Sequence, residues 1–390
     1  MLKRLRSLLR APEEKASRVS NLIALGQLGK ARWTPRDYTL LTREGYVKNA
    51  IVHRAVKLVA ESAASLPWLA HVDAVENAEH PLLTLLAAPN ARQNGAGLME
   101  IAYTHLLLAG NAYLEAVAVG DTVRELYALR PDRVRVVPGS DGWPEAYEYA
   151  VSGRTIRMSQ ADGPVAPILQ LTLTNPLDDH YGLSPLEAAA YALDTHNASA
   201  KWNKALLDNA ARPSGALIYS RSDGTTLSEA QFTRLKEELE TSYQGSTNAG
   251  RPMLLEGGLD FKSMSLTPKD MDFLEARNAA AREIALAFGV PPMLLGIPGD
   301  NTYSNYQEAN RSFWRQTVLP LAARTGAAIS QWLEPVYGAV ALTIDADRVD
   351  ALSVDRAAAW QRLSDASFLT INEKREALGY TPIEGGDRLA

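Results

Sequence analysis

The sequence predicts an α+β protein, in which helices and strands occupy separate stretches of the chain. Residues 49–109 repeat their apolar side chains at helical spacing, and residues 112–173 then turn to short segments rich in β-branched and aromatic residues. Further along, two helices with clear start and stop signals flank a compact insertion at residues 211–266. Runs of helices followed by runs of strands are typical of α+β folds.

The N-terminal half supplies the first helices and the strands. Asn49–Leu66 has a helical pattern that Pro67 stops, and Leu98–Ala109 is a second apolar helix, closed by Gly110. Clusters of Gly, Pro and Asp then separate five predicted strands: Ala112–Val119, Val123–Leu129, Val134–Val137, Ala146–Val151 and Ile168–Leu173. Residues 41–180 are therefore expected to form an α+β domain with an antiparallel sheet.

The first long helix has a clear start signal. Ser184 is a predicted N-cap, Pro185 occupies the first helical position, and Glu187 completes a capping box. We expect this helix to reach about Asn209.

The second long helix begins at Thr267 and Pro268 and ends at Gly289, since Pro291 and Pro292 prevent its continuation. Its predicted apolar side consists of Met271, Leu274, Ala281, Ile284 and Phe288. Between the two helices lies a small module made of three predicted elements: strand-like Gly215–Ser220, a helix from Ser228 to near Gly245, and extended Pro252–Ser265.

A loop at residues 296–303 introduces the last part of the chain. A helix is predicted from Ser304, with Gln307 as its capping-box partner, and Pro320 should kink it. A strand at Val340–Ile344 and two short helices follow. The last of these begins at Thr370 and ends at Gly379.

Composition and charge exclude several function classes. The chain has no cysteine, so disulfides, thiolate metal sites and cysteine nucleophiles are ruled out. Residues 1–36 hold nine of the 40 Lys and Arg residues but only two of the 45 acidic residues, which leaves an acidic body. This excess of acidic residues argues against a protein that binds DNA tightly by neutralising its phosphates, but not against a conduit. We expect residues 1–40 to form a mobile basic arm.

Catalytic motifs are not found. Gly26–Ala31 is too short for a phosphate-binding Walker A loop, and neither a nucleophile elbow nor an HExxH motif occurs. We therefore expect no enzymatic activity and no cofactor. Asp178, Asp179 and His180 form the most metal-like cluster, but a turn before the Ser184 cap is the simpler interpretation.

Several short motifs follow one another in a characteristic order over residues 45–387. They are Val52–Pro67, Gly110–Tyr113, Leu129–Val134, Tyr181–Leu186, Ala211–Gly215, Asn248–Pro252, Phe288–Gly296, Thr302–Asn305 and Gly385–Asp387. Each motif is weak alone, but their order is specific. It resembles that of the portal proteins of long-tailed phages and gene transfer agents.

The resemblance implies a phage portal fold with an α+β wing, a two-helix stem, a small α/β clip, a kinked tunnel helix and a helical C-terminal crown. The implied boundaries are a basic arm at 1–40, the wing at 41–183, the first stem helix at 184–210, the clip at 211–266, the second stem helix at 267–289, the tunnel loop at 290–304, the kinked tunnel helix with its return strand at 305–345, and the crown at 346–390.

The same resemblance implies a non-catalytic subunit of a dodecameric ring at one capsid vertex, a conduit for packaging and ejection of double-stranded DNA without sequence specificity. Its implied partners are further copies of itself, the major capsid protein, the large terminase and a neck or adaptor protein, with no membrane. It would assemble in the host cytoplasm and then reside in the virion or phage-like particle. Glu237 and Glu238 are expected to bind the partners of the clip. The residues expected to face DNA in the tunnel are Gly299, Asp300, Asn301, Thr302 and Tyr303.

Two other function classes remain as alternatives. A metal-dependent α+β hydrolase would use Asp178, Asp179 and His180, and a peripheral membrane protein would be anchored by the basic, amphipathic Met1–Arg10. The conduit interpretation accounts for the missing catalytic motifs and the acidic body together, so we prefer it.

Overall fold

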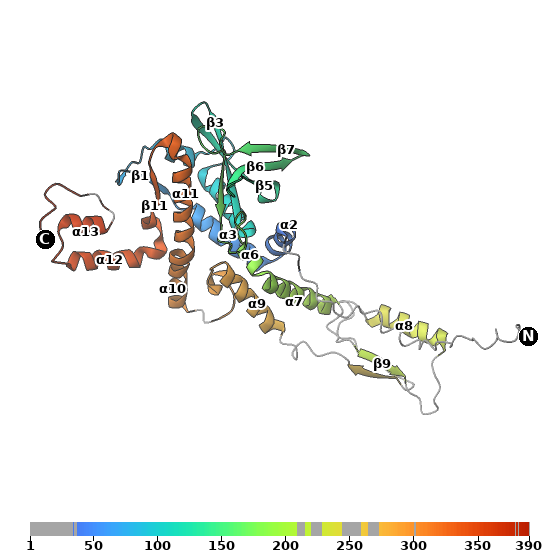
Figure 1. The fold of residues 1–390 in the computed structure, drawn as a ribbon. Helices are drawn as coiled ribbons and strands as arrows, with labels where there is room; N and C mark the ends of the chain where they lie inside the picture. Colours follow the sequence, from blue (N-terminus) through green and yellow to red (C-terminus); the bar gives the residue numbers. More distant parts are fainter. Residues whose placement is uncertain are drawn as a thin grey trace, which may run out of the picture. The chain divides into compact units, whose positions relative to one another are not determined.

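The computed structural model describes residues 34, 37–208, 215–219, 228–243, 259–263, 273–299, 302–378, 380 and 382–389 (Figure 1). Most of the expected arm at residues 1–40 lies outside this set. Near the arm's end, α2 (Tyr38–Thr42) is a helix capped by Asp37. Thr34 donates hydrogen bonds from its backbone N and its hydroxyl to the Asp194 carboxylate, at 2.7 and 2.5 Å.

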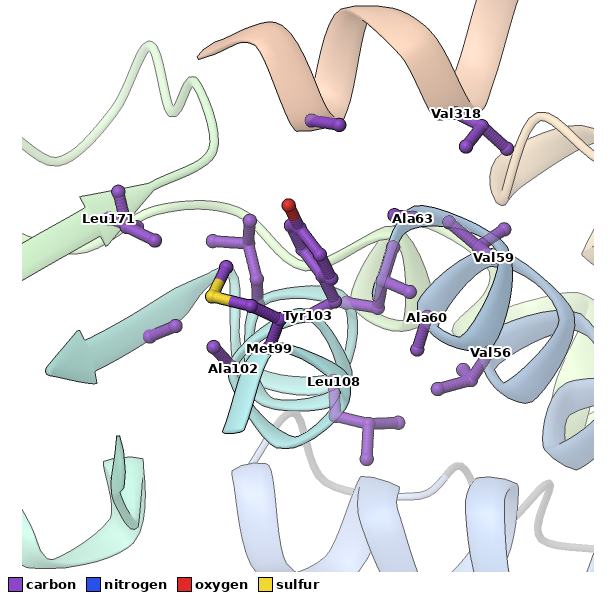
Figure 2. Packing of buried hydrophobic residues seen from close by; sticks show 14 of the residues in the cluster. Val56, Val59, Ala60, Ala63, Met99, Ala102, Tyr103, Leu108, Leu171 and Val318 are labelled. Atoms are coloured by element: carbon purple, nitrogen blue, oxygen red, sulfur yellow. The ribbon is translucent and has the colours of Figure 1, made fainter. Parts of the chain in front are cut away.

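Two helices form the centre of the main hydrophobic core. α3 (Ala50–Ala64) and α5 (Gly95–Ala109) lie side by side, as their apolar patterns predict. Figure 2 shows this core around the fully buried Tyr103 of α5, with Val56, Val59 and Ala60 contributed by α3. Gly110 ends α5 in a left-handed conformation with φ 73°, which glycine adopts without steric cost.

The five predicted strands are present, but they divide between two antiparallel sheets rather than one. β3 (Asn111–Val119) lies between β4 (Thr122–Leu129) and β8 (Ile168–Thr172). In the second sheet, β6 (Pro144–Val151) lies between β5 (Val134–Pro138) and β7 (Arg154–Ser159). The 3₁₀ turn η2 (Pro131–Arg133) separates the two sheets along the chain. β7 was not predicted because most of its residues are exposed, so it lacks the alternation that marks a half-buried strand.

A third sheet joins parts of the chain that are far apart in sequence. β1 (Trp68–Val72) pairs with β11 (Ala341–Ile344) on one side and with β2 (Val75–Glu76) on the other. The strand expected at 340–344 is therefore confirmed, while β1 and β2 were missed. The π-helical turn η1 (Arg43–Val47) and helix α4 (Pro81–Ala87) complete the N-terminal region.

The first long helix is interrupted near its start. Ser184 caps it as predicted, since its hydroxyl accepts a hydrogen bond from Leu186 N at 3.0 Å. However, α6 (Pro185–Ala188) ends at Ala189, where ψ is 6°, and α7 (Ala190–Asp208) then begins. One continuous helix was therefore the wrong prediction.

The second long helix is followed by a long helical segment with its own interruption. α9 (Phe273–Ala287) ends as predicted at Gly289, whose φ is 64°, and the short η4 (Pro292–Leu295) follows. α10 (Tyr303–Phe313) is capped by Thr302, two residues before the predicted Ser304 cap. A π-helical turn, η5 (Trp314–Val318), then separates α10 from α11 (Leu319–Tyr337).

Pro320 lies at the start of α11, directly after the π-helical turn, and Val318 before it keeps helical dihedral angles, so the helical run continues through the proline as predicted. A proline inside such a run has no N–H to donate to the preceding turn. The segment is interrupted close to the predicted kink, but the irregular turn comes before the proline.

The insertion between α7 and α9 contains the predicted elements. β9 (Gly215–Tyr219) pairs with β10 (Leu259–Ser263), and α8 (Glu229–Tyr243) begins after Ser228. Ser228 and Gln231 exchange hydrogen bonds between backbone N and side-chain oxygen, at 3.0 and 3.3 Å.

The C-terminal part is mostly helical. It consists of η6 (Ala346–Arg348), η7 (Asp350–Leu352), α12 (Ser353–Asp365) and α13 (Ile371–Ala377). Thr370 and Glu373 form the predicted capping box of α13. No helix among the described residues is long and apolar enough to cross a membrane.

Candidate functional site

The candidate site is the pair of helices α7 and α9 together with the segments at their ends. The two helices pack against each other. α9 buries Ala280 and Ile284 in the main core, and Ala281 and Ala285 against Ile297. Leu274 was predicted on the apolar side, but its side chain is 69% exposed. Leu286 is 77% exposed and Tyr191 of α7 is 58% exposed. Each helix thus keeps apolar side chains exposed.

A polar network fixes α7 and α9 to the start of α3. Asn49 caps α3 with its Oδ1, which accepts hydrogen bonds from Ile51 N and Val52 N. Its Nδ2 therefore faces His196 Nδ1 of α7 at 3.0 Å. The other ring nitrogen, Nε2, lies 3.4 Å from Nε of Arg277 in α9.

His196 is best suited to this network in its neutral form. Burial, and then the nearby Arg277 guanidinium, lower the pKa of His196. Asn49 Nδ2 and Arg277 Nε each face one ring nitrogen, and a neutral imidazole accepts a hydrogen bond at one of the two. Protonation of the ring would remove that acceptor. The network therefore ties α7 and α9 to the start of α3.

The motifs at Gly110 and Gly182 meet in space. A Cβ at either glycine would lie 2.2 or 2.1 Å from the carbonyl oxygen of the other. Asn111 Oδ1 accepts a hydrogen bond from Gly182 N at 2.9 Å, and Ser184 Oγ donates one to Leu107 O at 2.9 Å. These contacts fix the start of α6 against the end of α5 and the start of β3.

The predicted tunnel loop is described only in part. Asp300 and Asn301 lie outside the described residues. Arg282 of α9 donates a hydrogen bond to Pro298 O beside Gly299. On the other side, Thr302 caps α10 by accepting a hydrogen bond from Asn305 N at 3.2 Å. Tyr303 is 79% exposed, and Gln307, predicted as a capping-box partner, instead donates to its hydroxyl at 3.1 Å.

The predicted clip residues lie on α8. Glu237 is exposed, and Glu238 follows it in the same helix.

The cluster of Asp178, Asp179 and His180 forms a turn. Asp178 Oδ1 accepts hydrogen bonds from His180 N at 2.8 Å and Tyr181 N at 3.0 Å, which occupies that carboxylate in backbone capping. Among the described residues, no three acidic or histidine side chains are arranged to hold a metal ion. The alternative of a metal-dependent hydrolase has no support in this geometry.

A family model described as phage portal protein matches residues 50–379. The chain belongs to the phage portal protein family. The interpretation drawn from the order of the sequence motifs is thereby confirmed.

Portal-family relatives extend over nearly the whole chain. An uncharacterized protein of Rickettsia bellii is 42% identical over 351 residues, which cover 89% of this chain and 90% of the relative. The probable portal protein of Streptomyces phage phiC31 is 27% identical over 398 residues, with 93% and 84% coverage. The portal protein of Enterobacteria phage HK97 is 26% identical over 361 residues, with 88% and 81% coverage.

Solved structures agree with this portal fold. A chain from the virion of a native gene transfer agent particle is 52% identical, with a TM-score of 0.70 and coverage of 93% of this chain and 98% of the other. A chain from the neck of such a particle, computed with C12 symmetry, is 51% identical with a TM-score of 0.69 and coverage of 93% and 99%. An HK97-family phage portal protein from Corynebacterium diphtheriae has a TM-score of 0.55 at 18% identity, with coverage of 80% and 95%, and supports the fold alone.

Two features of this portal-family site were not predicted from the sequence. The Asn49–His196–Arg277 network joins residues from three helices, and only the Asn49 cap had a local signal, a polar residue just before an apolar helical run. The contact between Gly110 and Gly182 was also missed. Both glycines stood in recognised motifs, but nothing in the sequence indicated that the motifs touch.

Proposed function

We propose that this chain assembles with identical copies into a dodecameric ring at one vertex of a phage-like particle, and that double-stranded DNA enters and leaves the particle through the ring. The similarity to a chain of a gene transfer agent virion, at 52% identity over 93% of this chain, carries the proposal. At that identity, fold and assembly surfaces are shared together, whereas a likeness of fold alone would say little about function.

The stem gives independent support for self-association. Leu274, Leu286 and Tyr191 are apolar side chains exposed on two helices that are otherwise packed together. Exposed apolar surface next to small side chains allows a neighbouring helix to approach closely, and a neighbouring subunit would bury it.

The finer roles follow from the same proposal. The clip, through Glu237 and Glu238, binds the large terminase during packaging and a neck protein afterwards. The loop from Gly299 to Tyr303 faces the DNA, and the major capsid protein surrounds the wing. The ring assembles in the host cytoplasm and stays in the finished particle. It catalyses no reaction and needs no cofactor.

Removal of the chain from the producing cell tests the proposal. Particles made without it should contain no nuclease-protected DNA, and expression of the chain in trans should restore it. Heads that fill with DNA in the absence of the chain would contradict the role as conduit.

A further inference from the structure

α12 is rich in apolar residues, but its own chain buries little of their surface. None of its described side chains is buried, although six of its 13 residues are Val, Ala, Trp or Leu. Trp360 is 47% exposed and Val354 is 60% exposed. An isolated helix of this length is marginal in water, so α12 needs burial from another source.

A groove runs along α12. It encloses about 850 Å³ between α12, the start of α11 and the end of α13. Its apolar lining comes from Leu319, Leu352, Ala358, Ala359, Trp360, Ala377 and Leu378. Among the described lining residues, three arginines (Arg315, Arg356 and Arg362) outnumber one acidic residue, Asp347, which pairs with Arg356. The groove therefore suits a segment with apolar side chains and carboxylates.

The C-terminal strap of the chain, residues 380–389, has that chemistry. It is held against α13 by Asn372, whose Nδ2 donates hydrogen bonds to Ile383 O and Asp387 Oδ1 at 3.1 and 2.8 Å. Ile383 is 46% exposed and Leu389 is 66% exposed. Glu384 and Asp387 are exposed between them. No described strap residue lines the groove of its own chain, and the side chains of Ile383, Glu384 and Leu389 stay exposed.

We propose that the groove along α12 receives the C-terminal strap of a neighbouring copy of this chain. The apolar strap residues cover Trp360, and the strap carboxylates lie against the groove arginines. The two surfaces differ, so the contact is head-to-tail, and a head-to-tail contact closes into a ring when the rotation fits. Opposite charges on the two surfaces fix the register. This inference rests on the proposed ring and assigns one of its subunit contacts.

Cross-linking tests the contact directly, because the chain has no cysteine of its own. Ala358→Cys places a thiol in the groove, and Arg388→Cys places one on the exposed strap. Rings of the double variant, treated with a short bis-maleimide, should give a ladder of covalent multimers on denaturing gels. Either single variant should give none, since a head-to-tail contact brings groove to strap and never groove to groove.

Charge exchange tests the pairing. Arg362→Glu and Glu384→Arg, each placed in the double-cysteine background, should lower the ladder yield about twofold to fivefold, the range that an exposed ion pair is worth. Combining the two reversals should restore the yield. Arg154→Glu, an equal charge change on the exposed β7, is the matched control and should leave the yield unchanged.

Images of the same preparations separate this contact from the ring itself. Rings with a central hole that give no ladder would overturn the strap contact and leave the ring intact. Dimers from a single-cysteine variant would also overturn it, because they require groove-to-groove contact. Absence of rings under every condition would overturn the proposed function, and this contact with it.

Discussion

At the scale of single residues, the close contact between Gly110 and Gly182 can be tested separately from the strain of a left-handed backbone conformation. Gly110 and Gly120 both have positive φ, 73° and 61°. A Cβ at Gly110 would lie 2.2 Å from Gly182 O, whereas a Cβ at Gly120 would meet nothing within 4 Å. The left-handed conformation costs a similar amount of free energy in both alanine variants, roughly 1–2 kcal/mol.

We expect Gly110→Ala to lower the free energy of unfolding by about 1–3 kcal/mol more than Gly120→Ala, because the added methyl group must displace backbone. Chemical denaturation of the two variants side by side measures the difference. Equal losses would mean that the Gly110–Gly182 contact does not constrain the fold.

A second residue, His105, makes stability depend on pH. Its Nδ1 is buried without a hydrogen-bond partner. Burial is the main cause that lowers the pKa of His105 to about 4, while Asp132 acts in the opposite direction. An unfolded histidine has a pKa of about 6.5. Between these values the unfolded chain binds more protons than the folded one, so stability must fall as the pH falls from about 6.5 to about 4.

Replacing His105 with Gln should therefore flatten the loss of stability over that window, by up to about 1.4 kcal/mol for each pH unit. His53→Gln, at an exposed position, makes the same substitution elsewhere and is the matched control. Thermal unfolding at several pH values compares the three proteins. An unaltered slope in His105→Gln would rule out His105 as the titrating group.

At the scale of elements, local signals predicted where helices begin and end more reliably than how elements combine. The caps Ser184 and Thr370 and the terminating Gly110 and Gly289 act within one turn of chain, so the sequence indicates them directly. The break at Ala189 carries no such signal. The π-helical turn at 314–318 lies just before Pro320, which indicates an irregularity but not its form.

Local sequence patterns also could not predict which distant strands pair with each other. β1 has its partner β11 some 270 positions away, with Ala70 opposite Leu342. Leu274 was placed on the apolar side of α9 by periodicity alone, but that periodicity cannot separate a face buried within the chain from one left for a neighbouring subunit.

The clip is an element with a predicted partner surface. Glu237→Lys with Glu238→Lys should weaken the binding of the terminase or the neck protein, because it reverses two charges on α8, and it should leave ring assembly intact. Glu76→Lys with Glu79→Lys makes the same charge change at exposed positions of the wing and serves as the control. Pull-down with the purified partner, together with imaging of rings, measures both effects. If the clip variant loses its rings, the module is structural and the assignment is wrong.

The tunnel loop is a second element with a testable role. One arginine in place of Asp300 in every subunit would add attraction for DNA phosphates, so packaging and ejection should slow, most at low salt. Asp121→Arg, in the exposed turn between β3 and β4, controls for the charge change. Time courses of DNA release from purified particles at two salt concentrations are the measurement. Normal rates of DNA release in the Asp300 variant would show that the loop does not face DNA in the tunnel.

At the scale of the whole molecule, the described surfaces are incomplete without a neighbour. α9 exposes Leu274 and Leu286, and α12 buries none of its described side chains. A dodecameric ring would cover such surfaces in every subunit at once. An acidic body suits a conduit, because weak repulsion keeps a DNA duplex from adhering to the wall.

Electron microscopy of the purified chain tests this central claim most directly. The account predicts end-on views of a closed ring with a central hole and rotational symmetry, twelvefold in assembled particles. A protein that stays monomeric in every solution condition, and that is present as single copies in intact particles, would contradict it.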